Sequence, residues 1–149
     1  MLVALVEPEI PQNTGSVARL CAATGTPLHL VGKLGFSLED RYLKRAGLDY
    51  WPFVDLHVHD AWSAFSTETA NVRRFAFSSH GESSYTRIAF QEDDVLVFGG
   101  ESRGLPDDVR RELEPLHCIP MPGEGVRSLN LANAVSIVLY EGLRQLGRV

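Results

Sequence analysis

The sequence predicts an α/β domain with a mostly parallel sheet flanked by helices, and three observations carry this prediction. Short apolar runs with the character of buried strands recur along the whole chain. The segments between them repeat apolar residues at helical spacing, and glycine or proline marks many of the boundaries. A chain of 149 residues can bury one sizeable core, so a single domain is expected over residues 1–149.

The first half of the chain is expected to hold three strands, at residues 1–6, 27–31 and 54–59. Pro8 and Pro11 form a rigid turn after the first strand, and a helical pattern then begins at residue 13 or 14 and stops at Gly25. Residues 37–40 resemble a capping arrangement, which predicts a short helix to residue 46. A further helix is expected at residues 61–67.

The second half is expected to hold three more strands, at residues 75–78, 94–98 and 117–121, with a polar loop at residues 79–86. A helix opens at Leu105-Pro-Asp-Asp and ends at Pro115. The last helix has Asn130 in the N-cap position and apolar residues on every side. Such a helix is buried on more than one side, so it threads the core, packs against a partner subunit, or does both.

The ligand site is expected at the carboxyl ends of the strands, where open parallel sheets bind their ligands. The loops after the first, fifth and sixth strands carry unusual polar and glycine content. The sequence has neither a G-x-G-x-x-G fingerprint nor a Walker-type G-K-[ST], which argues against a conventional dinucleotide or nucleotide-phosphate site.

Composition points to a globular protein, with 44% hydrophobic and 22% charged residues. No apolar run reaches membrane-spanning length, and the N-terminus lacks the features of a signal peptide. Cys21 and Cys118 lie in apolar patterns without metal-type spacing, which indicates buried thiols in a reducing compartment and a cytoplasmic protein. The net charge of −5 argues against holding nucleic acid by bulk electrostatics and, taken alone, favours a small-molecule enzyme.

Asp55, His57 and His59 share one face of the third strand because their spacing is two residues. Leu56 and Val58 fill the opposite face, so the solvent side of a half-buried strand explains the polar face better than a metal site does. We therefore expect no metal.

Residues 41–51 interleave basic and aromatic side chains, including Lys44 and Arg45. This composition suits phosphates and stacked bases, but a solvated helix followed by core aromatics would produce the same pattern. The segment is a candidate RNA-binding surface.

Three further stretches each have a structural and a functional interpretation. Asn13 fits a helix cap and Arg19 a solvated helix position, within Glu7-Pro-Glu-Ile-Pro-Gln-Asn-Thr-Gly-Ser-Val-Ala-Arg. Glu101 fits a surface ion pair after a glycine turn, within Phe98-Gly-Gly-Glu-Ser-Arg-Gly-Leu-Pro. Ser128 and Asn130 fit capping roles, within Ile119-Pro-Met and Arg127-Ser-Leu-Asn-Leu-Ala-Asn-Ala-Val.

Taken together and in this order, the three stretches resemble the three motifs of the trefoil-knot (SPOUT) RNA methyltransferases, and they span nearly the whole chain. The resemblance is to the minimal tRNA ribose methyltransferases, the TrmL or YibK-like branch. It implies a deep C-terminal trefoil knot, S-adenosylmethionine as methyl donor and a homodimer. It further implies 2'-O-methylation of the wobble nucleotide, cytidine or modified uridine, in leucine tRNAs.

The resemblance also implies which residues form the site. Arg19 is the proposed base or activator, but an arginine is almost never deprotonated, so we expect it to bind a phosphate and stabilise a developing alkoxide. Glu101 would orient Arg19 or a substrate group, and Asn13, Ser128 and Asn130 would hold the ribose or shape the loop. The residues expected to line the cofactor pocket are Phe77, Gly99, Ile119, Met121, Ser128 and Leu129.

Three alternatives stay open on the sequence. The enzyme could act at another tRNA or rRNA position. A non-catalytic RNA- or nucleotide-binding module would keep the glycines but would not need Arg19 and Glu101 together. A metal-dependent hydrolase would depend on His57 and His59 and would lose activity to a chelator.

Overall fold

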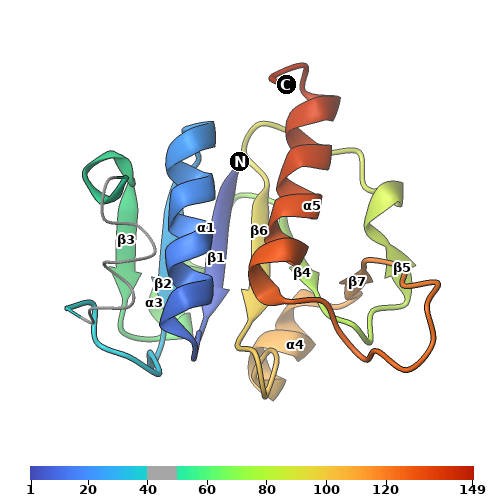
Figure 1. Ribbon diagram of the computed structural model, residues 1–149, viewed down its shortest axis with the longest axis horizontal. Helices are drawn as coiled ribbons and strands as arrows, with labels where there is room; N and C mark the ends of the chain where they lie inside the picture. Colours follow the sequence, from blue (N-terminus) through green and yellow to red (C-terminus); the bar gives the residue numbers. More distant parts are fainter. Residues whose placement is uncertain (40–49) are drawn as a thin grey trace.

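The domain is organised on a parallel sheet in the computed structural model, which describes residues 1–39 and 50–149. Within those residues the sheet has seven strands in the order β3-β2-β1-β6-β4-β7-β5, and every pairing is parallel (Figure 1). The predicted α/β class is therefore confirmed. The strands are β1 (Leu2–Val6), β2 (Leu28–Val31), β3 (Leu56–His59), β4 (Arg74–Phe77), β5 (Ser83–Ser84), β6 (Val95–Gly99) and β7 (His117–Cys118).

Helices cover both faces of this sheet. On one face α1 (Pro11–Thr24) packs beside α5 (Leu131–Gln145), and on the other lie α3 (Trp62–Glu68) and α4 (Asp107–Leu113) (Figure 1). Two short 3-10 turns are η1 (Trp51–Phe53) and η2 (Tyr85–Arg87). Most of the helix expected at residues 37–46 lies outside the described residues, as do Lys44 and Arg45. In the described part of the chain, no helix is long and apolar enough to cross a membrane.

The alternation of side chains along β1 divides the core into two layers. Val3 and Leu5 point into the layer under α1 and α5, and Ala4 and Val6 point into the layer under α3 and α4. All four are buried. Because both faces of β1 are covered, its sequence is apolar at every position rather than at alternate ones.

The last helix buries one side within a single chain. Val135, Val138 and Leu139 are fully buried against the sheet. Ile137 is 37% exposed and Tyr140 is 47% exposed, so the expected burial on more than one side is not completed by the chain itself.

The first helix begins earlier than the sequence pattern predicted. The predicted start was residue 13 or 14, whereas α1 starts at Pro11 with Ile10 as an N-cap that offers no side-chain bond. The ring of Pro11 fixes a helical φ and needs no N–H partner, which suits the first turn of a helix. Asn13 consequently lies inside the first turn, and its side chain is free to bind elsewhere.

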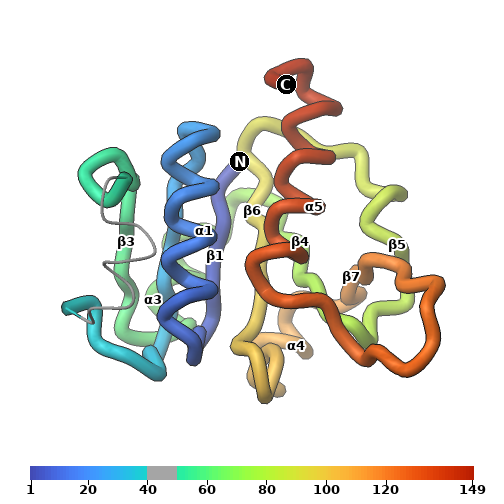
Figure 2. Tube along the Cα trace, in the orientation of Figure 1, coloured from blue at the N-terminus to red at the C-terminus, as the bar shows by residue number. Residues whose placement is uncertain are grey.

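The short strand β7 enters the sheet between β4 and β5, although these two strands are neighbours in sequence. The strand expected at residues 117–121 is only two residues long, and the polar loop expected at residues 79–86 contains β5 and η2. The turn at Gly81 lies so close to β7 that an added Cβ would be 2.4 Å from the carbonyl carbon of His117. Figure 2 shows the chain continuing from β7 through a long loop to α5.

Candidate active site

The carboxylate of Glu101 holds the start of α1. Glu101 follows β6 at the carboxyl edge of the sheet. Its oxygens accept hydrogen bonds from the backbone N–H groups of Glu9 at 2.8 Å and Ile10 at 3.3 Å, and from the side-chain amide of Asn13 at 2.9 Å. N–H groups at the start of a helix lack partners within the helix, so a carboxylate placed here satisfies donors and complements the helix dipole.

Asn13 and Asn130 connect this carboxylate to the last helix. The amide nitrogen of Asn130 donates to the Oδ1 atom of Asn13 at 2.9 Å. The Oδ1 atom of Asn130 in turn accepts from the backbone N–H groups of Ala132 at 2.9 Å and Asn133 at 3.3 Å, which makes it the predicted N-cap of α5. The chain Glu101–Asn13–Asn130 therefore joins the loops after β1, β6 and β7, as the sequence predicted for these loops.

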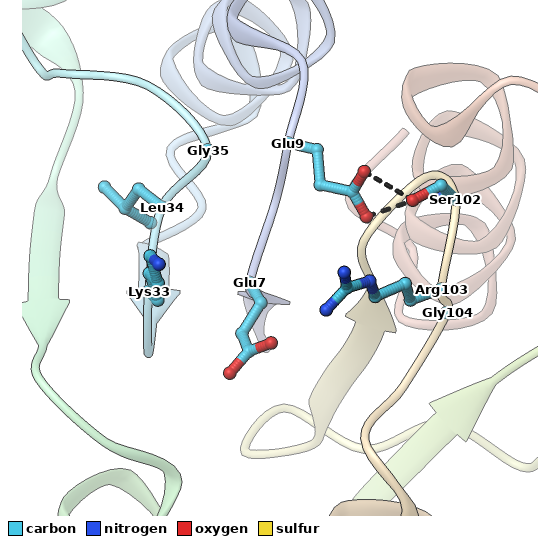
Figure 3. Close-up of a pocket in the computed structure, with 8 residues that line it drawn as sticks. All are labelled: Glu7, Glu9, Lys33, Leu34, Gly35, Ser102, Arg103 and Gly104. Atoms are coloured by element: carbon cyan, nitrogen blue, oxygen red, sulfur yellow. Dashed lines mark hydrogen bonds between the residues drawn. The ribbon is translucent and has the colours of Figure 1, made fainter.

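A polar cleft of about 260 Å³ opens beside this network, at the carboxyl ends of β1 and β2 (Figure 3). Ser102 donates to the carboxylate of Glu9 through its hydroxyl at 2.5 Å and its backbone N–H at 3.2 Å, and these bonds lower the pKa of Glu9. Lys33 and Arg103 place positive charge around the same opening. The cleft thus offers both anionic and cationic groups to a ligand.

The guanidinium of Arg19 lies apart from the Glu101 network within one chain. It sits 4.5 Å above the ring centre of Tyr50, and Nη2 donates to the Tyr50 hydroxyl at 3.1 Å. The acceptor oxygens of Glu101 are occupied instead by donors at the start of α1. Among the described residues, the structure does not bring Arg19 and Glu101 together, so an orientation of one by the other is absent from the single chain.

The residues expected to line the cofactor pocket lie at the ends of β4 and β6 and in the segment between β7 and α5. Phe77 ends β4, is paired in register with Phe98 of β6, and stacks on that ring at 4.9 Å. Its side chain is only 6% exposed, so it forms part of the floor rather than the open surface. Gly99 ends β6, where an added Cβ would be 2.2 Å from the backbone of Gly104. Ile119 and Met121 are half-buried after β7, whereas Ser128 and Leu129 are exposed in the loop before α5.

Comparison with known proteins identifies the family. The model of the SpoU rRNA methylase family matches residues 1–140. The chain belongs to the SpoU methylase family.

This SpoU methylase resembles several named relatives over nearly its whole length. It is 51% identical over 144 residues to the tRNA (cytidine(34)-2'-O)-methyltransferase of Methylovorus glucosotrophus, covering 96% of this chain and 94% of the relative. A solved structure that concerns 2-OH methylation of C/U34 on tRNA is 55% identical, with a TM-score of 0.93 and coverage of 97% and 95%. An AdoMet-bound rRNA methyltransferase from Sinorhizobium meliloti is 30% identical, with a TM-score of 0.87, covering 97% of this chain and 56% of its own.

Sequence reasoning missed two features of this SpoU methylase site. The first is Glu9, whose acidic side chain in a proline-rich turn gave no local sign that it would bind Ser102 across the sheet edge. The second is the contact of Arg19 with Tyr50, which lie 31 residues apart. Both contacts depend on strand order, and no periodicity in the sequence encodes strand order.

Proposed function

We propose that this protein transfers the methyl group of S-adenosylmethionine to the 2'-hydroxyl of the ribose at nucleotide 34 of a tRNA. The observation that carries the proposal is the hydrogen-bonded chain Glu101–Asn13–Asn130, which unites the three motif loops at one edge of the sheet. The names of relatives at 51% and 47% identity support the position and the chemistry. Leucine tRNAs and cytidine or modified uridine as target follow from the motif resemblance. The cytoplasm as location follows from the two cysteines in apolar patterns, and it completes the proposal.

The exposed loop before α5 fits a methyl donor that carries an adenosine. Its Val126 is 66% exposed and its Leu129 is 36% exposed, so both side chains supply apolar contact surface for an adenine ring. An added Cβ on Gly123 would meet nothing within 4 Å, so ligand atoms can approach the backbone there. Phe77, Gly99, Ile119, Met121, Ser128 and Leu129 would hold the donor. When bound, it supplies an electrophilic methyl group on a sulfonium centre.

Methyl transfer breaks the bond between the methyl carbon and sulfur, forms a bond between that carbon and the 2'-oxygen, and passes the proton of the ribose hydroxyl to water. The hydroxyl is a poor nucleophile, so the protein must orient it and stabilise the developing negative charge. Arg19 stays protonated and acts through its charge, with donors left over from the Tyr50 contact for a neighbouring phosphate. Ser128 and the amide groups of Asn13 and Asn130 would hold the ribose, and Glu101 would fix the start of α1.

The separation of Arg19 from Glu101 in one chain supports a homodimer. Ile137 and Tyr140 on α5 leave an apolar face that a second subunit would bury. Pairing of two chains along α1 and α5 would let the arginine of one protomer face the motif loops of the other. The site would then be complete only in the dimer.

The arrangement of β7 supports the expected trefoil knot. The chain reaches β7 from α4 on one face of the sheet and leaves toward α5 on the opposite face. In between, it passes among β4, β5 and the turn that joins them, where the Ser78 N–H donates to the His117 carbonyl at 2.9 Å. A segment that crosses the sheet between two strands that are consecutive in sequence is what threading through their connecting loop requires, and this supports the proposal of a knot.

The proposal is tested by incorporation of labelled methyl groups from S-adenosylmethionine into bulk tRNA. Wild type should label tRNA, and Arg19→Ala should lose at least the roughly 100-fold typical of removing a transition-state donor while still binding cofactor. Arg111→Ala, an exposed arginine on α4 at the opposite face, is the matched control and should keep activity.

Mapping of the alkali-resistant phosphodiester locates the modified nucleotide, because a 2'-O-methyl group prevents alkaline cleavage. Resistance after nucleotide 34 supports the assignment. Resistance elsewhere in tRNA or rRNA would show that the enzyme methylates another position. Cofactor binding without any methyl transfer by wild type would favour the non-catalytic binding module.

A further inference from the structure

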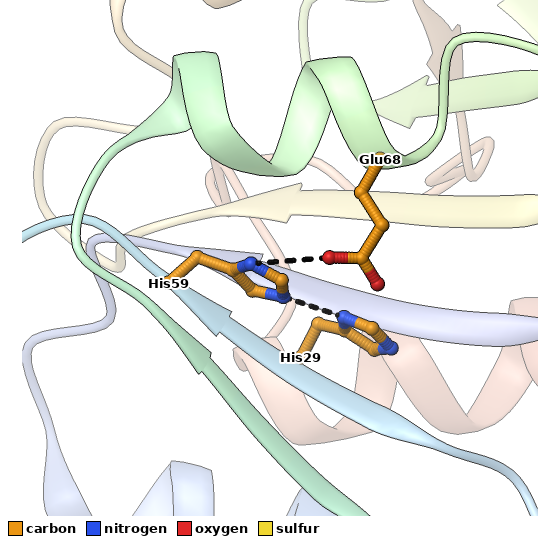
Figure 4. A group of neighbouring side chains, drawn as sticks. All are labelled: His29, His59 and Glu68. Carbon is orange, nitrogen blue, oxygen red and sulfur yellow. Dashed lines mark hydrogen bonds and ion pairs between the residues drawn. The ribbon is translucent and has the colours of Figure 1, made fainter.

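Two histidines and a glutamate meet at the end of the sheet that is formed by β2 and β3, away from the motif loops (Figure 4). The Nδ1 atom of His29 on β2 lies 2.8 Å from the Nε2 atom of His59 on β3. The Nδ1 atom of His59 lies 3.7 Å from the Oε2 atom of Glu68, the last residue of α3. Three secondary-structure elements thus contribute one metal-ligand type of side chain each.

The strand register explains why these side chains share one face. His29 pairs with His57 and Val31 pairs with His59 across the parallel strands. Residues two apart on a strand point to the same side, so all three imidazoles face α3. The ring of Phe65 on α3 then closes the cluster, edge-on to both His29 at 5.4 Å and His59 at 5.2 Å.

The two inner histidines are withdrawn from water. His29 is 4% exposed, and the side chain of His59 is 10% exposed. A neutral imidazole presents a nitrogen lone pair, which is the form that ligates metals.

We propose that His29, His59 and Glu68 form a binding site for a divalent late-transition-metal ion, of which zinc fits best. One nitrogen from each imidazole and one carboxylate oxygen all lie within 4.8 Å of one another. Two imidazoles and a carboxylate suit zinc, whereas magnesium and calcium prefer oxygen ligands. The expectation of no metal considered Asp55, His57 and His59 alone; the structure adds His29 and Glu68.

Metal entry requires only a small adjustment. Zinc bonds of about 2.0–2.2 Å in a tetrahedral arrangement place ligand atoms roughly 3.3 Å apart. The 2.8 Å contact between the imidazole nitrogens must therefore open by about half an ångström. Glu68 is 56% exposed, so its side chain can rotate toward the ion, and the fourth position is left for water. The bound ion would cross-link the edge strand β3 to β2 and to α3.

A plain hydrogen-bond relay from Glu68 through His59 to His29 is the competing explanation. It would hold the same elements together but would bind no ion. Zinc binding by the wild type distinguishes the two. His57 belongs to neither arrangement, because it stacks on His29 at 4.5 Å, is 46% exposed in its side chain, and binds Asp55 at 3.0 Å. Its position just two residues before His59 makes it a matched control.

The test uses the full chain with affinity tags removed and metal stripped by a chelator. Zinc titrated by calorimetry should bind at one ion per chain, and cobalt(II) should give the visible absorption bands of a tetrahedral site. The Tm should rise with zinc concentration. Glu68→Gln and His59→Gln should weaken binding by at least about tenfold, the lower range for loss of even an outer partner of a metal site. His57→Gln should bind as wild type does.

Three results would overturn the proposal. Absence of saturable zinc binding in wild type would leave the relay as the explanation. If His57→Gln loses as much zinc affinity as His59→Gln does, the exposed His57 is a ligand and the proposed site is wrong. Glu68→Gln preserves the shape of a side chain at an exposed helix end. An unchanged zinc affinity in this variant would show that the carboxylate is not a ligand.

Discussion

Asn13 and Asn130 are 117 residues apart in sequence, and a single amide–amide hydrogen bond of 2.9 Å joins them. Each amide also has a second partner, Glu101 for Asn13 and the start of α5 for Asn130. The orientation of both amides is therefore fixed, because each nitrogen donates and each oxygen accepts. This bond couples the entrance of the first helix to that of the last.

Asn13→Asp should break this relay while preserving its shape. A carboxylate at residue 13 would face Glu101 without a donor between them, which should lower the free energy of unfolding by about 1–3 kcal/mol. Two facing carboxylates share a proton, so the pKa of the pair rises and the defect should shrink as the pH falls from about 8 to about 5. Urea unfolding at several pH values measures this loss of stability. Asn71→Asp, in an exposed turn, is the control.

Adding Glu101→Gln to Asn13→Asp should restore part of the lost stability. The new amide would donate to residue 13 and its oxygen would still accept from the backbone of Glu9. A double-mutant cycle should give a favourable coupling of about 0.5–3 kcal/mol. Strict additivity of the two substitutions would show that the pair does not interact as the hydrogen bond indicates.

Gly99→Ala should damage both stability and cofactor binding. An added Cβ would be 2.2 Å from the backbone carbon of Gly104, and backbone cannot rotate away as a side chain can. We expect a loss of about 1–3 kcal/mol and a Tm lower by several degrees. Gly123→Ala, whose Cβ would meet nothing within 4 Å, should change Tm little. Differential scanning calorimetry with and without S-adenosylmethionine compares the two variants, and equal behaviour would contradict the close approach at Gly99.

The Cys21 thiol should be inert in the folded protein. Burial raises its pKa to about 12, so only about one molecule in ten thousand carries the reactive thiolate at pH 8. In Cys118→Ser, which leaves Cys21 as the only cysteine, a thiol reagent should label almost nothing until denaturant is added. Rapid labelling under native conditions would mean that α1 opens readily.

Lys44→Glu and Arg45→Glu should weaken tRNA binding while sparing cofactor binding. Both positions lie outside the described residues, so the prediction rests on the basic and aromatic composition of residues 41–51. If each contacts a phosphate, each substitution should lower the dependence of tRNA affinity on salt by about one unit of log–log slope. Filter binding at several salt concentrations measures this, and an unchanged affinity in both variants would rule out the segment as a tRNA contact.

Elements with local signals could be predicted from the amino-acid sequence. Apolar runs identified β1, β2 and β6, Gly25 marked the end of α1, and Asn130 was recognised as the cap of α5. Such signals depend on periodicity and on backbone groups a few residues apart, so they can be read from one stretch of chain. The carboxyl-edge location of the motif loops followed from the parallel sheet, because that topology places all such loops at one edge.

Contacts between groups that are distant in sequence could be found only in the folded chain. The insertion of β7 between β4 and β5, the Arg19–Tyr50 contact and the His29–His59–Glu68 cluster all depend on strand order. Strand order arises from the packing of whole layers. No pattern within one strand determines which strand pairs with it. The same packing explains the partners of Asn13. Because α1 starts at Pro11, Asn13 lies inside the first turn, where its side chain contacts Glu101, which is 88 residues away in sequence.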